Sequence, residues 1–326
     1  MKNKVCLVAG GAGFIGVNLV SELLNQGANV FVGDNLSLGS YKNLHNFSKL
    51  TNQSSIKIDL SSSDGSDKLF ELTTSKYGQI DEVWHLAANS DIPAGVDNPD
   101  IDYKDTFMTT YNLLKSSKKY SVKKFNFASS SAVYGDWKET ALDESLGPLK
   151  PISYYGAMKL ASEAQICSAK ESFLKQANIF RFPNVVGAPA THGVIFDLID
   201  KLKESPNELN VLGDGTQRKS YLHVTDLTDA MIYISDAEIE KIQPTIVNIG
   251  CDDEGVTVRT IAELVVRRCS PKAELIFGDE ERGWIGDVPK FKYDTSQLKG
   301  FGWLPKMNSF EAIERAINEI ALQKNI

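Results

Sequence analysis

A tyrosine and a lysine stand four residues apart, as Tyr155 and Lys159, within a segment that has helical spacing. Residues at this distance share one helix face, one turn apart. An ammonium group beside a phenol favours the phenolate, so the spacing predicts a pKa for Tyr155 below the ordinary tyrosine value of about 10. Such a group can take a proton from a substrate hydroxyl while hydride leaves the same carbon. A surface tyrosine–lysine pair is the plain alternative, and the neighbouring Tyr154 shows how common a tyrosine match is.

A run of serines, Ser129-Ser130-Ser131, directly follows the apolar strand-like segment 124–128 and precedes Tyr155 by about 25 residues. Ligands of open α/β sheets bind at the carboxyl ends of the strands, which is where these hydroxyls would lie. A serine there could hydrogen-bond the reacting oxygen and orient the Tyr155 phenol. By itself the segment would be interpreted as a serine-rich loop. Together with Tyr155 and Lys159, it indicates a three-residue proton-transfer site.

A glycine-rich turn near the N-terminus connects a predicted strand to a predicted helix in Val5–Gly16, which reads VCLVAGGAGFIG. Gly10 and Gly13 would let the backbone approach a pyrophosphate, and Gly16 would let the helix pack closely on the strand. The helix N-terminus, which begins at Phe14 and Ile15, presents unpaired N–H groups and a positive dipole end to that anion. Strand, glycine turn and helix together predict a dinucleotide site rather than a turn without a ligand.

A second strand-like segment, 30–32, ends at Gly33 and Asp34. Asp34 lies 18 residues beyond Gly16, where a carboxylate is expected to meet the adenosine ribose hydroxyls. No arginine or lysine follows before Lys42, so a 2′-phosphate would find repulsion and no partner. The sequence therefore predicts NAD rather than NADP as the cofactor.

The composition of the 326 residues is that of an ordinary globular protein with a net charge of −7. Acidic and basic residues are interspersed, which argues against nucleic acid as the main partner. The four cysteines are far apart and no histidine pair has the spacing of metal ligands, so we expect neither a disulfide framework nor a metal site. The N-terminus continues directly into a strand, and no apolar segment approaches the ~20 residues of a membrane span. We therefore expect a cytoplasmic protein.

Strand-like and helix-like segments alternate through the first half of the chain. This alternation predicts an α/β fold, a Rossmann-type doubly wound parallel sheet with a smaller C-terminal α/β substrate lobe. We expect an NAD-binding domain over residues 1–183, to which 224–250 return with a strand at 245–249. Residues 184–223 and 251–326 would form the substrate-binding lobe. Two long helices, predicted over 101–120 and 154–177, could pair with those of a second copy in a four-helix bundle, making a homodimer.

The motifs taken together resemble the extended short-chain dehydrogenase/reductases, an NAD-dependent epimerase/dehydratase family. The resemblance covers nearly the whole chain and is greatest to UDP-glucose 4-epimerases of the archaeal type. It is carried by the glycine motif at 10–16, Asp34-Asn35-Leu36-Ser37, Asp59-Leu60, His85-Leu86-Ala87-Ala88, the segments 129–135 and 155–159, Arg181–Gly187, Thr191–Val194, Leu212–Tyr221 and Arg282–Pro289.

The resemblance implies roles for individual residues. Tyr155 would be the catalytic base, Lys159 its pKa partner and ribose anchor, and Ser130 the catalytic hydroxyl. The cofactor would be held by these residues: Gly10, Gly13, Phe14, Ile15, Gly16, Asp34, Asn35, Ser37, Asp59, Leu60, Leu86, Ala87, Ala88, Tyr155 and Lys159. The nucleotide-sugar substrate would be bound by Asn184, Val194, Arg218 and Arg282, of which the guanidinium groups suit bidentate diphosphate contact.

The reaction implied is the 4-epimerisation of a nucleoside-diphosphate hexose through a transient 4-keto sugar, a step of carbohydrate biosynthesis. Three positions depart from patterns of the family. Ser131 and Ala132 replace the Asp-Glu of the 4,6-dehydratases, which argues against water elimination. Asn89–Pro93 lacks an arginine of the archaeal-type epimerases, and Thr106 replaces an asparagine. The last two departures leave open a C4 dehydrogenase or 4-ketoreductase of a GDP-, UDP- or CDP-linked hexose or heptose. A second alternative is a non-catalytic NAD-sensing scaffold, which would predict loss of the catalytic set, although Ser130, Tyr155 and Lys159 are all present.

Overall fold

The computed structural model describes residues 1–45, 54–138, 140–237, 242–280, 288 and 291–326. Its contacts divide the chain into two compact units, each assembled from three stretches. The first unit comprises Met1–Gly135, Pro148–Arg181 and Met231–Val247, and the second comprises Asp136–Gly147, Phe182–Ala230 and Asn248–Ile326. The expected division into an NAD-binding domain and a substrate lobe concerns ligands, which contacts alone do not test, so it stays a prediction.

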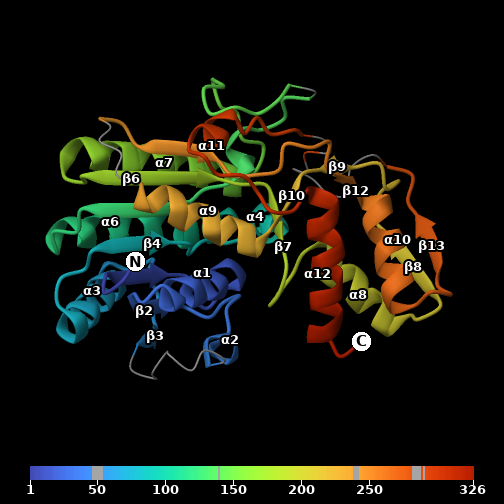
Figure 1. The fold of residues 1–326 in the computed structure, drawn as a ribbon, viewed down its shortest axis with the longest axis horizontal. Helices are drawn as coiled ribbons and strands as arrows, with labels where there is room; N and C mark the ends of the chain where they lie inside the picture. Colours follow the sequence, from blue (N-terminus) through green and yellow to red (C-terminus); the bar gives the residue numbers. More distant parts are fainter. Residues whose placement is uncertain (46–53, 139, 238–241, 281–287, 289–290) are drawn as a thin grey trace. The chain divides into compact units, whose positions relative to one another are not determined.

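The first unit is built on a seven-stranded sheet (Figure 1). The strand order is β3 (Ser55–Lys57), β2 (Asn29–Asp34), β1 (Val5–Ala9), β4 (Glu82–His85), β5 (Lys124–Ala128), β6 (Gln176–Arg181) and β11 (Thr245–Asn248). Neighbouring strands from β3 to β6 run parallel. The order reverses between β1 and β4, which is where doubly wound sheets open a crevice for ligands. The predicted Rossmann-type fold is thereby confirmed, as is the return of the strand near 245 to this sheet.

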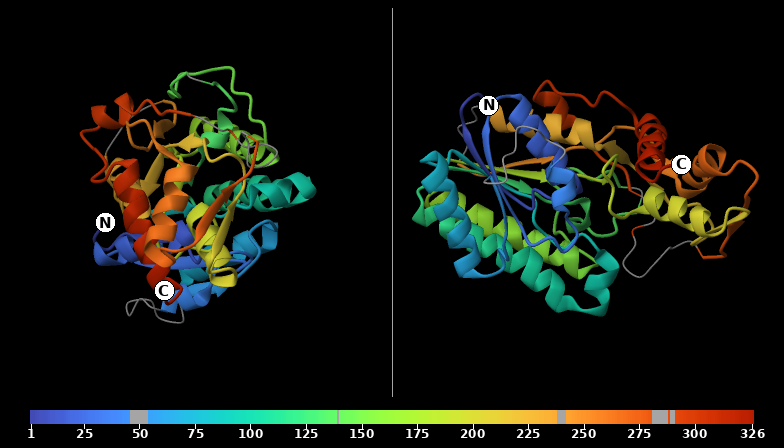
Figure 2. Two further views of the ribbon diagram at one scale, coloured as in Figure 1. Left: turned by 90° about the vertical axis from the view of Figure 1, so that its right-hand side faces the viewer. Right: turned by 90° about the horizontal axis from the view of Figure 1, so that it is seen from below.

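Helices cover both faces of this sheet (Figure 2). Helix α1 (Phe14–Asn25) lies on one face, and α3 (Ser63–Tyr77), α6 (Thr109–Lys119) and α7 (Tyr154–Ser172) lie on the other, with α6 packed against both α3 and α7. Apart from the edge strand β3, the strands are buried nearly throughout, as expected of a parallel sheet covered on both sides. Among the fully buried side chains between sheet and helices are Leu7, Val83, Phe125 and Ile179.

The helix expected over 101–120 is interrupted by a wider turn. The chain passes from α5 (Pro99–Asp102) through a π-helical segment, η1 (Tyr103–Met108), into α6. Single turns of π-helix are frequent at functional sites. Helix α4 (Ile92–Asp97) directly precedes α5, and α2 (Tyr41–His45) lies earlier in the chain; neither of these short helices was predicted.

The helix expected over 154–177 ends earlier, at Ser172. The register of the sheet is the reason: Lys124 of β5 pairs with Gln176, so the residues from Gln176 onward belong to strand β6. Hydrogen bonds from the backbone N–H groups of Lys175 and Gln176 to the Lys123 carbonyl already precede the strand. The predicted end of this helix was therefore wrong by about one turn.

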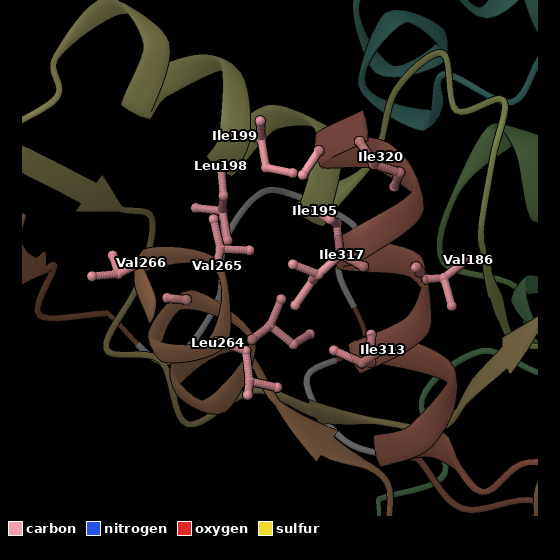
Figure 3. Close-up of a cluster of buried hydrophobic side chains, with 14 of the residues drawn as sticks. Val186, Ile195, Leu198, Ile199, Leu264, Val265, Val266, Ile313, Ile317 and Ile320 are labelled. Carbon is pink, nitrogen blue, oxygen red and sulfur yellow. The ribbon is translucent and has the colours of Figure 1, made fainter. Parts of the chain in front are cut away.

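The second unit has a core of three helices, α8 (Val194–Glu204), α10 (Val258–Cys269) and α12 (Ser309–Gln323), which pack pairwise against one another. Figure 3 shows their apolar side chains meeting between the helices, with Ile195 and Ile199 from α8, Val265 from α10 and Ile317 from α12. Apolar residues recur every three or four positions on each helix, so one face of each is buried here.

Short strand pairs flank these helices. Strand β7 (Asn184–Val186) runs parallel to β10 (Tyr221–His223), and β8 (Glu208–Val211) runs parallel to β13 (Glu274–Phe277). Strand β9 (Arg218–Lys219) runs antiparallel to β12 (Val256–Thr257). Helix α11 (Ser296–Gly300) is one turn long. The strands β7, β9, β12 and β13 were not predicted; β9 and β12 are only two residues long, which leaves no periodic pattern to recognise.

Within the part of the chain that the structure describes, no helix has the length and apolar character needed to cross a membrane. The cytoplasmic location stays a prediction.

Candidate active site

Strand β1 ends in the glycine-rich turn, and two of the glycines are required by close backbone contacts. Gly10 has φ +81°, and a Cβ there would lie 2.5 Å from the Ala87 nitrogen. A Cβ on Gly16 would lie 2.2 Å from the carbonyl oxygen of Gly10. These distances are below any normal carbon contact. The turn after β1 can therefore lie this close to the segment after β4 only with glycine at position 10, and helix α1 can begin this close to the turn only with glycine at position 16.

Gly13 differs from the other two, because a Cβ there would meet nothing closer than 3.6 Å. The protein leaves this space open at the N-terminus of α1. Gly13 is the N-cap and provides no side-chain hydrogen bond to the helix, so the N–H groups of Phe14 and Ile15 have no capping partner among the described residues. An open space bordered by unpaired N–H groups and a helix dipole fits a diphosphate. The cradle thus fits the pyrophosphate of a dinucleotide.

The Asp34 carboxylate at the end of β2 is buried beside the glycine turn. One oxygen accepts a hydrogen bond from the Ala12 N–H at 2.9 Å, and the other accepts one from Leu36 at 2.7 Å. Burial raises the pKa of Asp34, and these two backbone hydrogen bonds oppose the rise. The carboxylate holds the glycine turn to the loop after β2. In that loop the Asn35 side chain accepts hydrogen bonds from the backbone and hydroxyl of Ser37.

The other expected cofactor residues follow β3 and β4. Partial burial acts to raise the pKa of Asp59, but hydrogen bonds from Ser61 and the charge of Lys104 outweigh it and lower the pKa. Leu60 beside it is buried. The N–H groups of Leu86 and Ala87 both donate to the Ala9 carbonyl, which ties the end of β4 to the end of β1. The residues expected around the cofactor therefore lie at the carboxyl ends of β1 to β4, on the side of the sheet where the crevice at the reversal of strand order opens.

The serine segment and the start of α7 are brought together by a close backbone contact. Ser153 caps α7 by accepting a hydrogen bond from the Gly156 N–H at 3.1 Å. A Cβ on Gly156 would lie 2.4 Å from the Ala132 carbonyl oxygen, so only glycine permits this approach. The contact places Tyr155 within hydrogen-bonding reach of Ser130. Tyr154 is 51% exposed, which leaves Tyr155 as the tyrosine that faces the serines.

Lys159 lies one turn further along α7 and is almost fully buried. Its Nζ donates a hydrogen bond to the Ala128 carbonyl at 2.6 Å, at the end of β5. The same nitrogen lies 4.7 Å from the ring centroid of Phe127 and 5.7 Å from that of Tyr155. Burial lowers the pKa of Lys159 to about 7, against the opposing charges of Glu163 and Asp102.

The predicted direction of the Tyr155 pKa was wrong. Burial raises the pKa of Tyr155 to about 12; the Ser130 hydrogen bond opposes this rise, and the charge of Asp102 adds to it. Because the pKa of Lys159 is about 7, its ammonium is lost before the phenol ionises and cannot stabilise the phenolate. The sequence showed the spacing of the two groups but not their burial.

A buried ion pair that the sequence reasoning missed supports this site. Glu163 accepts hydrogen bonds from Arg181 at 3.0 and 2.7 Å and from the Ser129 hydroxyl at 2.5 Å. The Arg181 guanidinium also lies 4.9 Å from the ring centroid of Tyr134. The pair fixes the segment after β5 between α7 and β6. The position of Glu163, one helical turn after Lys159, was the available signal.

Three of the four expected substrate residues lie in the second unit. Asn184 pairs with Tyr221 across the β7–β10 ladder and is exposed, as is Arg218 on β9. Val194 begins α8 after Gly193, which has φ +106° and provides no side-chain cap. The fourth residue, Arg282, lies outside the described residues. Groups of histidine, cysteine and acidic side chains that could hold a metal ion are not found in the described ranges.

The sheet order, the glycine cradle and the acid at the end of β2 define a dinucleotide-binding protein of the Rossmann class. Residues 6–250 match the model of the NAD dependent epimerase/dehydratase family, and the chain belongs to this family. NAD is its cofactor, and it is an enzyme of that family, as predicted.

Several known proteins are similar over almost the whole chain. The "putative UDP-glucose 4-epimerase" of Methanocaldococcus jannaschii is 29% identical over 96% of this chain and 97% of its own. A crystal structure of a UDP-galactose 4-epimerase has a TM-score of 0.82 and 32% identity, covering 98% of this chain and 99% of its own. The Thermus thermophilus UDP-glucose 4-epimerase in complex with NAD has a TM-score of 0.82 and 27% identity, covering 97% and 98%.

Substitution of Gly13 and Gly16 by alanine should have different consequences. Gly13→Ala has room in the protein but fills the diphosphate cradle, so the variant should keep wild-type stability while its NAD affinity falls roughly tenfold or more. Gly16→Ala forces its Cβ against Gly10 and should lower the free energy of unfolding by about 1–3 kcal/mol. NAD titration calorimetry and denaturant unfolding measure both effects. Unchanged NAD affinity in a folded Gly13→Ala variant would contradict the assigned cradle.

The buried Lys159 should make stability depend on pH in a defined direction. Its pKa is about 7 in the folded protein and 10.5 ordinarily, so between these values the unfolded chain binds more protons and stability rises with pH. Relative to Lys159→Met, the wild-type free energy of unfolding should therefore increase from pH 7 toward pH 10, by at most about 1.4 kcal/mol per pH unit. Denaturant unfolding of both proteins across this range gives the difference, and a flat difference would contradict the lowered pKa.

Proposed function

We propose that this protein is an NAD-dependent 4-epimerase of nucleoside-diphosphate hexoses, acting through a transient 4-keto sugar. The observation that carries the proposal is the convergence of Ser130, Tyr155 and Lys159 at the carboxyl end of β5. The names of the similar proteins, which include UDP-glucose and UDP-galactose 4-epimerases, support the choice of reaction. Ser131 and Ala132 follow Ser130 and offer no acid–base pair for water elimination.

In this proposal Tyr155 takes the proton from the C4 hydroxyl and later returns it to the C4 oxygen, and the inversion at C4 would come from return of the hydride to the opposite face of the sugar. Ser130 holds both the reacting oxygen and the phenol, because its hydroxyl can donate and accept hydrogen bonds. The Ser130 hydrogen bond lowers the pKa of Tyr155 and so favours the phenolate, which is the form that can accept the proton. Lys159 is fixed by the Ala128 carbonyl and has further N–H groups for a ribose hydroxyl.

We assign the cofactor to the residues at the β1–β4 edge of the sheet. Gly10, Gly13, Phe14, Ile15 and Gly16 would surround the pyrophosphate, and Asp34 with Asn35 and Ser37 would hold the adenosine ribose. Asp59 and Leu60 would border the adenine, and Leu86, Ala87 and Ala88 would line the nicotinamide side. When bound, NAD supplies a reversible hydride acceptor for the C4 hydrogen. The residues of the chain supply the proton transfer, the orientation and the exclusion of water.

We assign the nucleotide diphosphate of the substrate to Asn184, Val194, Arg218 and Arg282. The exposed guanidinium of Arg218 is suited to a diphosphate, since its planar N–H groups can pair with two phosphate oxygens. The first N–H groups of α8, which Gly193 leaves without a side-chain cap, are a second set of donors for an anion.

The variant Tyr155→Phe tests the proton-transfer role. It removes only the phenol oxygen, so kcat for epimerisation should fall by roughly 10²–10⁴-fold while NAD binding is kept. The neighbouring Tyr154→Phe makes the same chemical change on the exposed side of the helix and should retain wild-type turnover. Turnover and NAD titration are measured for both. Wild-type turnover by Tyr155→Phe would exclude the proposed mechanism.

We propose further that two copies associate through α6 and α7, as a four-helix bundle. The outward face of these helices carries tyrosines that are half exposed in one chain: Tyr111 on α6 is 49% exposed and Tyr154 on α7 is 51% exposed. Ala157, Ala161 and Ala164 follow Tyr154 at intervals of three or four residues, so small residues that are at least partly exposed continue the same face of α7. Apolar side chains in such a row are typical of a surface that packs against a second copy.

Sedimentation of the wild-type protein at micromolar concentration should therefore show a dimer. Tyr111→Glu places a charge on the proposed interface and should shift the protein to monomer. Phe310→Glu introduces the same charge at a comparably exposed position on α12, 43% exposed, and should leave the dimer intact. A monomeric wild type, or equal sedimentation of both variants, would contradict this interface.

A further inference from the structure

Next to the proposed proton-transfer site the protein buries a carboxyl group that the mechanism has not used. Asp102, the last residue of α5, has no exposed surface. One of its oxygens accepts a hydrogen bond from the Asn89 side chain at 3.0 Å. The other oxygen, Oδ2, is buried and has no hydrogen-bond partner among the described residues. A half-satisfied buried acid is costly to maintain and calls for an explanation.

The surroundings of Asp102 are built to accommodate it. A Cβ on Gly95 would lie 1.9 Å from Asp102 Oδ2, so the carboxyl occupies space that only a glycine leaves free. Asn89 is held in turn, because its backbone N–H donates to the Thr106 hydroxyl and its side chain donates to the Asp91 carbonyl. Thr106 lies in the π-helical segment, which packs with α4 and α5 against α7. The carboxyl is therefore placed by several elements at once.

Asp102 is electrostatically coupled to both titrating residues of α7. Its charge raises the pKa of Tyr155 and that of Lys159, and the charge of Lys159 in turn lowers the pKa of Asp102. Asp105 of η1 and Asp91 at the start of α4 also face Asp102 and raise its pKa, while the Asn89 hydrogen bond lowers it. Burial is the largest influence and favours the neutral acid.

The other carboxylate near Lys159 is already occupied. Glu163 is paired with Arg181 through two hydrogen bonds and accepts a third from Ser129. Its charge is thus balanced by the guanidinium whatever the state of Lys159. Asp102 has an oxygen left over and no arginine beside it among the described residues. Asp102 is therefore the acid whose ionisation responds to the ionisation of Lys159 and Tyr155.

We propose that Asp102 is a positioning residue for the proposed C4 proton transfer: its buried carboxyl, with one unpaired oxygen in a pocket created by Gly95, is held by α4, α5 and η1 against α7 and acts through space on Tyr155 and Lys159. The inference rests on the proposed function only because it takes Tyr155 to be the group that transfers the C4 proton. Asp102 does not touch the substrate in this account, and no bond is made or broken at its carboxyl group. An ionised Asp102 favours the protonated forms of both Tyr155 and Lys159, and a neutral residue in its place removes this effect.

The test compares Asp102→Asn with Asp100→Asn in the NAD-loaded protein. Asp102→Asn removes the buried charge and keeps the acceptor for Asn89, whereas Asp100→Asn makes the same change at an exposed position on the same helix. Tyrosines labelled with ¹³C at Cζ are titrated by NMR, and the Tyr155 signal is identified by its loss in Tyr155→Phe. The pH dependence of kcat/KM is recorded in parallel.

Asp102→Asn should shift the ionisation of Tyr155 to lower pH, and the ascending limb of kcat/KM should move with it. Asp100→Asn should superimpose on the wild type. A Tyr155 titration that is unchanged by Asp102→Asn would overturn the inference while leaving the function proposed for Tyr155 intact. Full turnover by Tyr155→Phe would instead overturn the proposed function, so the two failures are distinguishable.

Gly95→Ala provides a second route to the same result should Asp102→Asn fail to fold. It keeps the carboxyl but drives Oδ2 from its place, so the Tyr155 ionisation should again shift to lower pH, by less than in a variant without the charge. An unchanged Tyr155 titration in folded Gly95→Ala, whose carboxyl has been displaced, would overturn the inference.

Discussion

The close approach of α7 to the segment after β5 is the contact on which the site depends. Because Gly156 has no side chain, its helix turn can lie against the Ala132 carbonyl. Ser130, Tyr155 and Lys159 then meet, although they come from two segments some 25 residues apart. Glu163 of α7, which is paired with Arg181 of β6, also accepts a hydrogen bond from Ser129 and so holds the same two segments together. A proton-transfer geometry is thus produced by backbone contact and buried charge, not by the reacting groups themselves.

Burial then determines the acid–base chemistry. The same enclosed position raises the pKa of Tyr155 and lowers that of Lys159, since each charged form loses its hydration. Only hydrogen bonds and fixed charges act against this effect. Ser130 favours the phenolate, and Asp102 and Glu163 favour the ammonium. The ionisable groups of the site are therefore coupled, and the loss of hydration on burial affects their pKa values as much as any single charge does.

The periodic segments of the sequence predicted the sheet, its parallel direction and the glycine cradle, because strand, turn and helix each leave a local pattern. Gly10 and Gly16 were interpretable for that reason. The role of Gly156 and the burial of Asp102 could not be predicted, since both depend on which residues the fold places against them. The end of α7 was misplaced because the register of β6, not helix propensity, determines where the strand begins. Arg282 was predicted as a substrate residue and lies outside the described residues, so that assignment stays a prediction.

The central claim is that the C4 hydrogen of a nucleotide sugar is removed and returned within one active site. The most direct measurement supplies the purified protein, without added nicotinamide, with UDP-, GDP- and CDP-linked hexoses and heptoses, and follows product stereochemistry together with the absorbance of bound NADH. The account predicts many turnovers to the C4 epimer with no net NADH. One equivalent of keto sugar accompanied by persistent NADH would contradict it and identify a dehydrogenase that needs a second substrate.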